Sequence, residues 1–352
     1  MTKTLDFLLL SIITLCIIGC SGKETATEDK LILKIDFDNI EDISNISEIT
    51  DTIELKGTSD DLPGIILRSR IYCDNMYLLD PLKAPGLYVF DLRGNYIRKI
   101  GNIGQGPGEL FDYTDFDVTP DRILILDNIS QKINIYSHEG VFIESQKVEP
   151  MTMNIATDKD SNVLWLDRGN VTSFKSDPLV WKLCRHTAES DSTFLSVPEA
   201  LDGITISPRN NFCKSEDGTI YYMPSLEPFI YTLEKGKLVS KLHLDLGSKW
   251  PDQSFFERHR NDETFTTVKD LKDGGYVVNL SFLENQKWIV TDFKIKDDYF
   301  ISVYNKTNSN SRLFKSSTGY DWGHPISLDE NRLLVASAID GVIISYLLND
   351  VK

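Results

Sequence analysis

The stretch Gly101-Asn-Ile-Gly-Gln-Gly-Pro-Gly-Glu109 separates two similar series of short apolar segments. Before it, Met76-Tyr-Leu-Leu-Asp80 precedes Leu87-Tyr-Val-Phe-Asp91. After it, Ile123-Leu-Ile-Leu-Asp127 precedes Ile133-Asn-Ile-Tyr136 in the same order, and Asp127 follows Asp80 by 47 residues. A repeat of this length made of four short strands is typical of the blades of a β-propeller. We therefore interpret residues 101–109 as the joint between two blades.

The segments around this pair predict an all-β fold, a six-bladed β-propeller with four strands in each blade. The predicted blades occupy residues 63–101, 110–148, 151–196, 212–246, 276–316 and a last stretch that begins near 322. Alternating strands within residues 31–57 have no blade of their own. Strands from one end of the chain can complete the last blade and leave no exposed edge, so we assign residues 31–57 to the closing blade. Residues 342–348 form either its third strand or a short closing helix.

The stretch 251–272 lacks the alternation of a strand. It begins with Pro251, and proline is favourable at the first position of a helix. A short helical insertion is therefore predicted between blades 4 and 5.

The composition is that of a folded, acidic chain. Its 352 residues are 41% hydrophobic and 10% aromatic, enough to bury a large core. The formal net charge of −16 argues against nucleic acid, whose phosphates require clustered Lys and Arg. We expect no nucleic-acid partner.

The amino terminus has the pattern of an export signal. Lys3 precedes an apolar run over residues 7–18 that is too short to span a bilayer comfortably. The run ends in Ile17-Ile-Gly-Cys20, which resembles the bacterial lipobox, in which the cysteine is lipidated and becomes the mature amino terminus. The resemblance implies a lipoprotein signal peptide over 1–20, a lipid anchor on Cys20, a flexible tether over 21–30 and a domain over 31–352. An ordinary cleaved signal or an uncleaved anchor is the alternative.

Three cysteines, Cys73, Cys184 and Cys213, lie outside the amino-terminal segment. An odd number at wide spacing gives no disulfide framework. Each lies in or beside a predicted strand, so we expect small buried side chains, although one disulfide pair stays open in an oxidising compartment.

The strand order, with Gly104-Gln-Gly-Pro-Gly-Glu109 followed by an aromatic residue, resembles the six-bladed β-propeller lipoproteins of Bacteroidetes, relatives of NHL-repeat proteins. The resemblance spans residues 31–350. It implies the propeller fold and a location in the cell envelope, at the periplasmic or surface face of the outer membrane. The membrane is then a partner through the lipid. It implies no reaction.

Familiar site motifs are incomplete. In the joint, Glu109 stands where the third glycine of a dinucleotide fingerprint would be, and no Lys-Ser or Lys-Thr pair follows for a phosphate loop. The joint is therefore a tight crossover, or alternatively a ligand-facing loop through Gln105 and Glu109. Asp158-Lys-Asp-Ser-Asn162 lacks the glycine and glutamate of a calcium loop and is interpreted as a hairpin turn. The five histidines show no paired metal spacing, so no metal site is assigned and the cofactor stays unknown.

Loops that lead from one blade into the next share one face of a propeller. We therefore expect residues 104–109, 198–209 and 318–325 to gather at the mouth of the channel. The predicted ligand-binding residues, charged for orientation or aromatic for stacking, are Arg68, Arg70, Gln105, Glu109, Tyr113, Trp322 and His324. No catalytic residue is assigned.

These features predict an envelope lipoprotein that binds a ligand or partner without chemistry of its own. A carbohydrate, a peptide or an envelope protein is the candidate partner. One alternative is a lyase or hydrolase with a metal in the central channel, which rests on analogy of fold. The other is a structural component of a surface complex.

Overall fold

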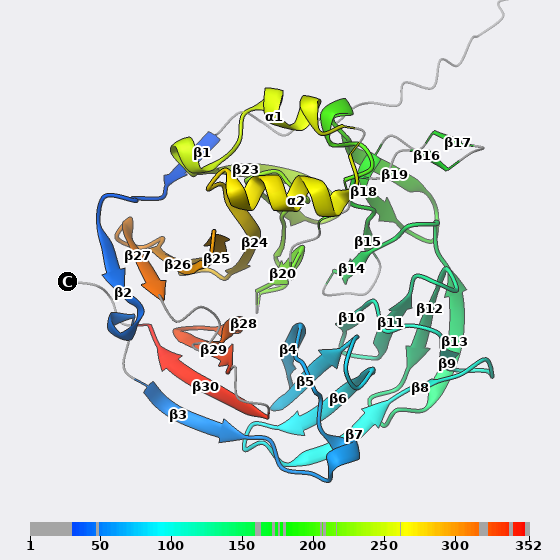
Figure 1. The fold of residues 1–352 in the computed structure, drawn as a ribbon. Coiled ribbons are helices and arrows are strands. Elements are labelled where there is room, and N and C mark those ends of the chain that lie inside the picture. The colour runs from blue at the N-terminus through cyan, green and yellow to red at the C-terminus, as the bar shows by residue number, and fades with distance from the viewer. Residues whose placement is uncertain are drawn as a thin grey trace, which may run out of the picture.

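The structure, a computed structural model, describes residues 30–46, 49–158, 163–170, 173–174, 177–178, 181–204, 206, 209–215, 217–260, 262–316, 323–337 and 341–348. Six blades, each built on four antiparallel strands, stand radially around a central axis, and two of the sheets carry a fifth, parallel strand (Figure 1). The innermost strands contact one another in sequence around the ring. They are β4 (Arg68–Tyr72), β10 (Asp115–Val118), β14 (Asn154–Thr157), β20 (Phe212–Lys214), β24 (Val277–Glu284) and β28 (His324–Asp329). The chain is a six-bladed β-propeller, so the predicted fold is confirmed.

The outer three strands of blades 1 to 5 follow the innermost strand in chain order. In blades 1 and 2 they are β5 (Asn75–Asp80), β6 (Gly86–Asp91) and β7 (Tyr96–Ile100), then β11 (Ile123–Asp127), β12 (Lys132–Tyr136) and β13 (Phe142–Lys147). In blades 3 and 4 they are β15 (Leu164–Asp167), β18 (Trp181–His186) and β19 (Asp191–Ser196), then β21 (Ile220–Tyr222), β22 (Phe229–Glu234) and β23 (Lys237–Asp245). In blade 5 they are β25 (Trp288–Ile295), β26 (Asp298–Asn305) and β27 (Asn310–Ser316). Two short ladders lie outside the blades, β8 (Asn102–Ile103) with β9 (Glu109–Leu110) and β16 (Ser173–Phe174) with β17 (Asp177–Pro178).

Blade 6 is completed by the amino-terminal part of the chain. Its strands β28, β29 (Arg332–Ala336) and β30 (Val342–Leu347) are joined by β3 (Ile49–Glu54), which pairs antiparallel with β30. The predicted closure by an amino-terminal strand is therefore confirmed, and β30 is the third strand rather than a helix.

The assignment of all of residues 31–57 to the closing blade is wrong. Strand β1 (Lys30–Lys34) pairs parallel with β23 as a fifth strand of blade 4, and β2 (Ile40–Asp42) pairs parallel with β27 of blade 5. The segment passes along the outside of three neighbouring blades (Figure 1). Each short strand covers the outer edge of a sheet that would otherwise present unpaired backbone groups.

The aspartates that mark the repeat tie each blade to the segment that leads into it. Asp80, at the end of β5, accepts hydrogen bonds from N–H groups of residues 64–65 and of the loop 82–84. Asp127, at the end of β11, accepts one from the N–H of Phe111. The 47-residue recurrence therefore reflects a repeated backbone cap.

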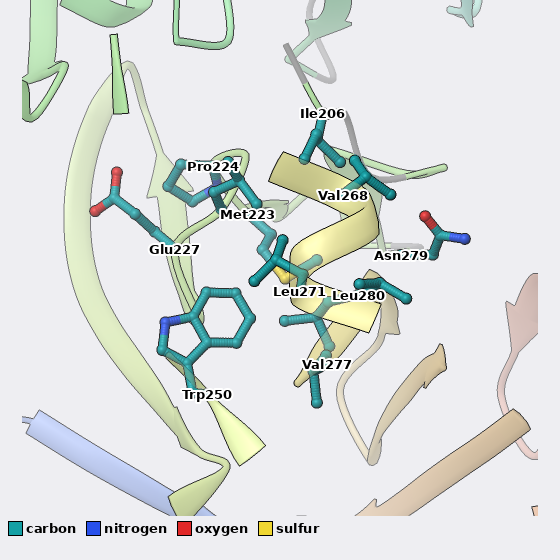
Figure 2. A pocket seen from close by; sticks show the side chains of 12 residues that line it. Ile206, Met223, Pro224, Glu227, Trp250, Val268, Leu271, Val277, Asn279 and Leu280 are labelled. Atoms are coloured by element: carbon teal, nitrogen blue, oxygen red, sulfur yellow. The ribbon is translucent and has the colours of Figure 1, made fainter. Parts of the chain in front are cut away.

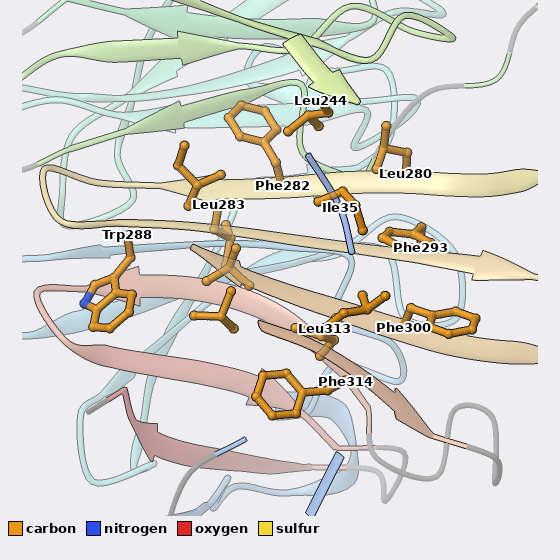
Figure 3. Close-up of a cluster of buried hydrophobic side chains, with 14 of the residues drawn as sticks. Ile35, Leu244, Leu280, Phe282, Leu283, Trp288, Phe293, Phe300, Leu313 and Phe314 are labelled. Carbon is orange, nitrogen blue, oxygen red and sulfur yellow. The ribbon is translucent and has the colours of Figure 1, made fainter. Parts of the chain in front are cut away.

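Apolar side chains from facing sheets form the core between blades. Figure 3 shows one such cluster, in which Leu244 of blade 4 lies near Phe282 of blade 5, and Phe293 and Phe300 of blade 5 belong to the same cluster. Ile35, directly after β1, is buried in the same cluster. Burying one such side chain stabilises the fold by about 1.5–3 kcal/mol, so the core holds the amino-terminal segment in place.

The predicted helical insertion lies between β23 and β24. It consists of α1 (Gln253–Arg258) and α2 (Thr264–Asp273), and the side chain of Asp252 caps α1 by accepting from the N–H of Phe255. Short 3-10 turns occur at Ile43–Asn45, Ser59–Asp61, Glu199–Leu201 and Gly247–Lys249. Within the described ranges, no helix is long and apolar enough to cross a membrane.

The three cysteines of the propeller are free. Cys184 and Cys213 are buried as predicted, but Cys73 is exposed, so the prediction is wrong there. Cys73 lies at the tip of the hairpin between β4 and β5 with φ of 46°, a turn position that faces solvent.

Candidate ligand-binding site

Charged side chains alternate along the innermost strands of blades 1 and 2. The two-residue period of a strand places Arg68 and Arg70 on one face of β4, and Asp115 and Asp117 on one face of β10. Arg68 Nη1 lies 2.7 Å from Asp115 Oδ1, and Arg70 Nε lies 3.9 Å from Asp117 Oδ1. Each arginine therefore faces an aspartate of the next blade.

Asp117 is a buried carboxylate that links four blades. Its Oδ2 accepts hydrogen bonds from the N–H of Thr157 at 2.7 Å and from Lys214 Nζ at 2.9 Å. Burial raises the pKa of this carboxyl, but the charges of Lys214 and Arg70 outweigh burial and hold the pKa below its ordinary value. Asp117 is therefore ionised at neutral pH.

A second group of charges lies at the opposite ends of the innermost strands. Arg209 forms an ion pair with Asp292, and its carbonyl oxygen accepts a hydrogen bond from Arg68 Nε at 2.6 Å. His324 Nε2 lies 2.7 Å from the carbonyl oxygen of Ile66 and therefore donates to it. Burial, with the charge of Arg209, lowers the pKa of His324 to about 3. His324 is neutral and engaged with the backbone.

A cavity of about 820 Å³ opens where the hairpins between the first and second strands of all six blades meet. We name it the channel cavity. The innermost strands contribute Arg70, Asp117 and Lys214 to its wall, and apolar contacts come from Tyr72 and Leu328. Six blades thus converge on one hollow that holds both charged and apolar groups.

The structure places the predicted site residues in separate regions. Arg70 lines the channel cavity, whereas Arg68 donates to the carbonyl oxygen of Arg209, and the charge of Arg209 acts on the pKa of His324. Trp322, like Cys20, lies outside the described residues. The ligand-binding role of Trp322 and the lipidation of Cys20 stay predictions.

The joint does not reach the channel. Lys132 Nζ and Asn134 Nδ2, both on β12, donate to the carbonyl oxygen of Glu109, and the Glu109 carboxylate accepts from the N–H of Gly106 within the joint. Tyr113 is buried and donates to the carbonyl oxygen of Ile100. Gln105 is exposed. Since β12 is the third strand of its blade, about 10 Å outward from β10 at ordinary strand spacing, the joint serves as a crossover.

Sequence reasoning missed Asp115, Asp117 and Lys214. A signal for the two aspartates was present, because Asp115 follows Arg68 by 47 residues and Asp117 follows Arg70 by 47, the same period as the repeat. Equivalent positions in consecutive blades therefore carry opposite charges. Nothing comparable marked Lys214, whose blade has a different length.

Among the residues that the structure describes, no group of three or more His, Cys, Asp or Glu side chains is arranged to hold a metal ion. Asp158, the first residue of the calcium-like turn, also lines the channel cavity, while residues 159–162 of that turn lie outside the description.

The model of one protein family, DUF5128, described as a 6-bladed beta-propeller, matches residues 21–320. The chain belongs to this family. No curated protein matches the chain in sequence.

Solved structures share the fold at low sequence identity. A Bacteroides fragilis protein that is provisionally named as exported is 16% identical, with a TM-score of 0.76 over 91% of this chain and 99% of that one. A member of the duf4221 family from Bacteroides vulgatus is 9% identical, with a TM-score of 0.58 over 86% and 97% of the two chains. Virginiamycin B lyase from Staphylococcus aureus, at 11% identity, has a TM-score of 0.46 over 85% and 89%. Identities this low show likeness of fold alone.

Proposed function

We propose that the protein is a lipid-anchored envelope propeller that binds a ligand through an anionic group at Arg70 and Lys214. Two cations share the single carboxylate of Asp117, so these three side chains carry a formal excess of one positive charge, while the cavity lining as a whole holds five acidic and four basic side chains. Arginine and lysine bind carboxylates and phosphates through charge-assisted hydrogen bonds. This excess charge beside a cavity built by six blades is the observation that carries the proposal.

The two cations are held in place yet accessible. Arg70 Nη1 donates to the carbonyl oxygen of Ser69 at 2.9 Å, and Nη2 donates to that of Phe212 at 3.3 Å. The side chains of Arg70 and Lys214 are 15% and 17% exposed. A fixed cation loses little side-chain entropy when an anion binds, which favours affinity.

The cavity also suits an apolar part of the ligand. Tyr72 lines it and stacks on His138 with ring centroids 5.6 Å apart, which holds the ring in one orientation. Leu92 and Leu328 add apolar surface. The expected ligand therefore carries an anionic group next to an apolar body.

Binding without chemistry is preferred over the metal-dependent lyase or hydrolase. Asp115 and Asp117 are each paired with an arginine, so neither is offered as a free base or metal ligand. The envelope location and the anchor on Cys20 rest on the lipobox resemblance and draw support from the provisional name of the Bacteroides fragilis protein.

The proposal is tested by titrating the purified full chain with a panel of mono- and dicarboxylates, phosphate esters and tripeptides. Calorimetry measures the binding of each compound. Lys214→Gln should weaken the binding of any anionic hit by about tenfold or more, the loss expected for one charge-assisted hydrogen bond. Lys237→Gln, an exposed lysine at the start of β23, is the matched control. Equal affinities of the two variants would contradict the proposal.

A further inference from the structure

A second cavity lies between blade 4 and the helical insertion. It has a volume of about 620 Å³ and is lined by the turn at Glu199–Leu201, by the start of β22, by His243 and by α1. We name it the insertion groove. The insertion leads into the beginning of β24, whereas the channel cavity lies at the far end of that strand. The two cavities are therefore separate sites.

The insertion groove continues into a small apolar recess. Leu226, Glu227 and Trp250 line both spaces, and the rest of the recess is lined by apolar side chains such as Met223 and Leu271 and by Asn279. Figure 2 shows the Trp250 indole facing these apolar side chains, while the Glu227 carboxylate points away from them. Trp250 and Glu227 therefore both line the boundary between the two spaces.

The carboxylate of Glu227 is fixed from behind by a buried cation. Lys182, whose side chain is fully buried, donates from Nζ to Glu227 and to the carbonyl oxygen of Ser225. Burial lowers the pKa of Lys182, and the Glu227 charge opposes that effect. The Glu227 side chain remains 21% exposed. Its remaining lone pairs can accept hydrogen bonds from a ligand. A cationic ligand would gain little binding free energy from Glu227, because Lys182 already balances its charge.

Two other carboxylates line the insertion groove, and only one of them has a cationic partner. Glu199 is paired with Arg260 at 2.6 Å, and Glu257 accepts a hydrogen bond from Gln253. The walls therefore offer carboxylate acceptors, of which Glu257 keeps its negative charge. Leu226, with φ of 56°, is held in a left-handed conformation that is costly for a bulky residue, and such strain concentrates at ligand sites.

We infer that the insertion groove binds a neutral carbohydrate. A sugar has an apolar C–H face that stacks on an indole, and hydroxyl groups that donate to carboxylate oxygens. Trp250 supplies the plane, and Glu227 supplies the acceptor. A cationic ligand gains little from Glu227 and Glu199, which already have cationic partners, and an anionic ligand is repelled by the exposed acceptor oxygens and by the charge of Glu257. This site is independent of the anion site at Arg70 and Lys214.

The test uses the full chain and tetrasaccharides of glucose, mannose, xylose and N-acetylglucosamine, with tetramers of glucosamine and of galacturonic acid as charged probes. Binding is followed by tryptophan fluorescence and calorimetry. We expect at least one neutral tetramer to bind at millimolar concentration or better. Trp250→Ala should weaken that binding by about tenfold, the value of one aromatic contact.

Two further variants separate the site from the stability of the fold. Ala200→Trp places bulk in the insertion groove and leaves residue 250 a tryptophan, and should abolish binding. Lys214→Gln, in the channel cavity, should leave it unchanged. The inference is overturned if no neutral tetramer binds, if a charged tetramer binds more tightly, or if Ala200→Trp binds as the wild type does.

Discussion

Arg70 and Asp117 occupy equivalent positions of consecutive innermost strands, one repeat of 47 residues apart, and approach to 3.9 Å across the boundary between blades 1 and 2. Lys214 reaches the same carboxylate from blade 4. One buried charge therefore connects parts of the ring that are distant in sequence, and its loss should affect the whole propeller.

Asp117→Asn should destabilise the fold by roughly 3 kcal/mol, because it leaves Arg70 and Lys214 facing a neutral group in a largely buried site. Urea unfolding at pH 7 measures the effect, with the exposed Asp121→Asn as control. Since the folded-state pKa of Asp117 is below the ordinary 3.8, its contribution is present above that pH and is lost as the pH falls through the folded-state pKa. Equal stability of the two variants at pH 7 would contradict this role.

Glu284 should act on stability with the opposite pH dependence. Burial raises the pKa of its carboxyl to about 7, although Lys306 Nζ lies 2.6 Å from Oε1 and opposes the shift. The folded state holds the proton more tightly than the unfolded chain, so stability falls as the pH rises from about 4.5 to about 7. The expected loss is about 3 kcal/mol. Glu284→Gln should remove this part of the pH dependence, and the exposed Glu330→Gln should not.

Two truncations should distinguish the contribution of β1 and β2 to stability from that of β3. Removal of residues up to 42 uncovers the outer edges of blades 4 and 5, whereas removal up to 57 also takes β3 from blade 6. The longer deletion should lower the melting temperature more and broaden the urea transition, because a blade loses its fourth strand and the ring is no longer closed. Identical melting of the two truncated chains would show that β3 does not fasten the ring.

Cys20→Ala should abolish membrane attachment. If Cys20 carries the lipid, the variant is recovered as soluble protein or as unprocessed precursor, because the acyl chains supply the anchor. Partition between detergent and aqueous phases measures the change. A variant that stays in the detergent phase as the wild type does would contradict the lipobox assignment.

The blades could be predicted from sequence because their strands repeat at a constant spacing around Asp80 and Asp127. The positions of β1 and β2 could not. A strand of three to five residues with few buried side chains can pair with any open sheet edge, and only the packing of neighbouring side chains such as Ile35 selects among the edges.

Only part of the candidate site could be predicted from the sequence. The glycines of the joint indicate a tight crossover, but they do not say which strand it covers, and it covers β12. The pairing of Arg70 with Asp117 could be read from their spacing. The contact of Lys214 with the same carboxylate depends on how the ring closes, and no local sequence pattern predicts that.

The anion site at Arg70 and Lys214 is tested most directly with a matched pair of ligands. Calorimetry on the full chain compares the tightest-binding tripeptide or carboxylate from the panel with its uncharged amide, at low and at high salt. An anion site predicts that the amide loses about tenfold or more in affinity and that salt weakens only the acid. Equal affinities for acid and amide, unchanged by salt, would show that the channel cavity does not recognise an anionic group.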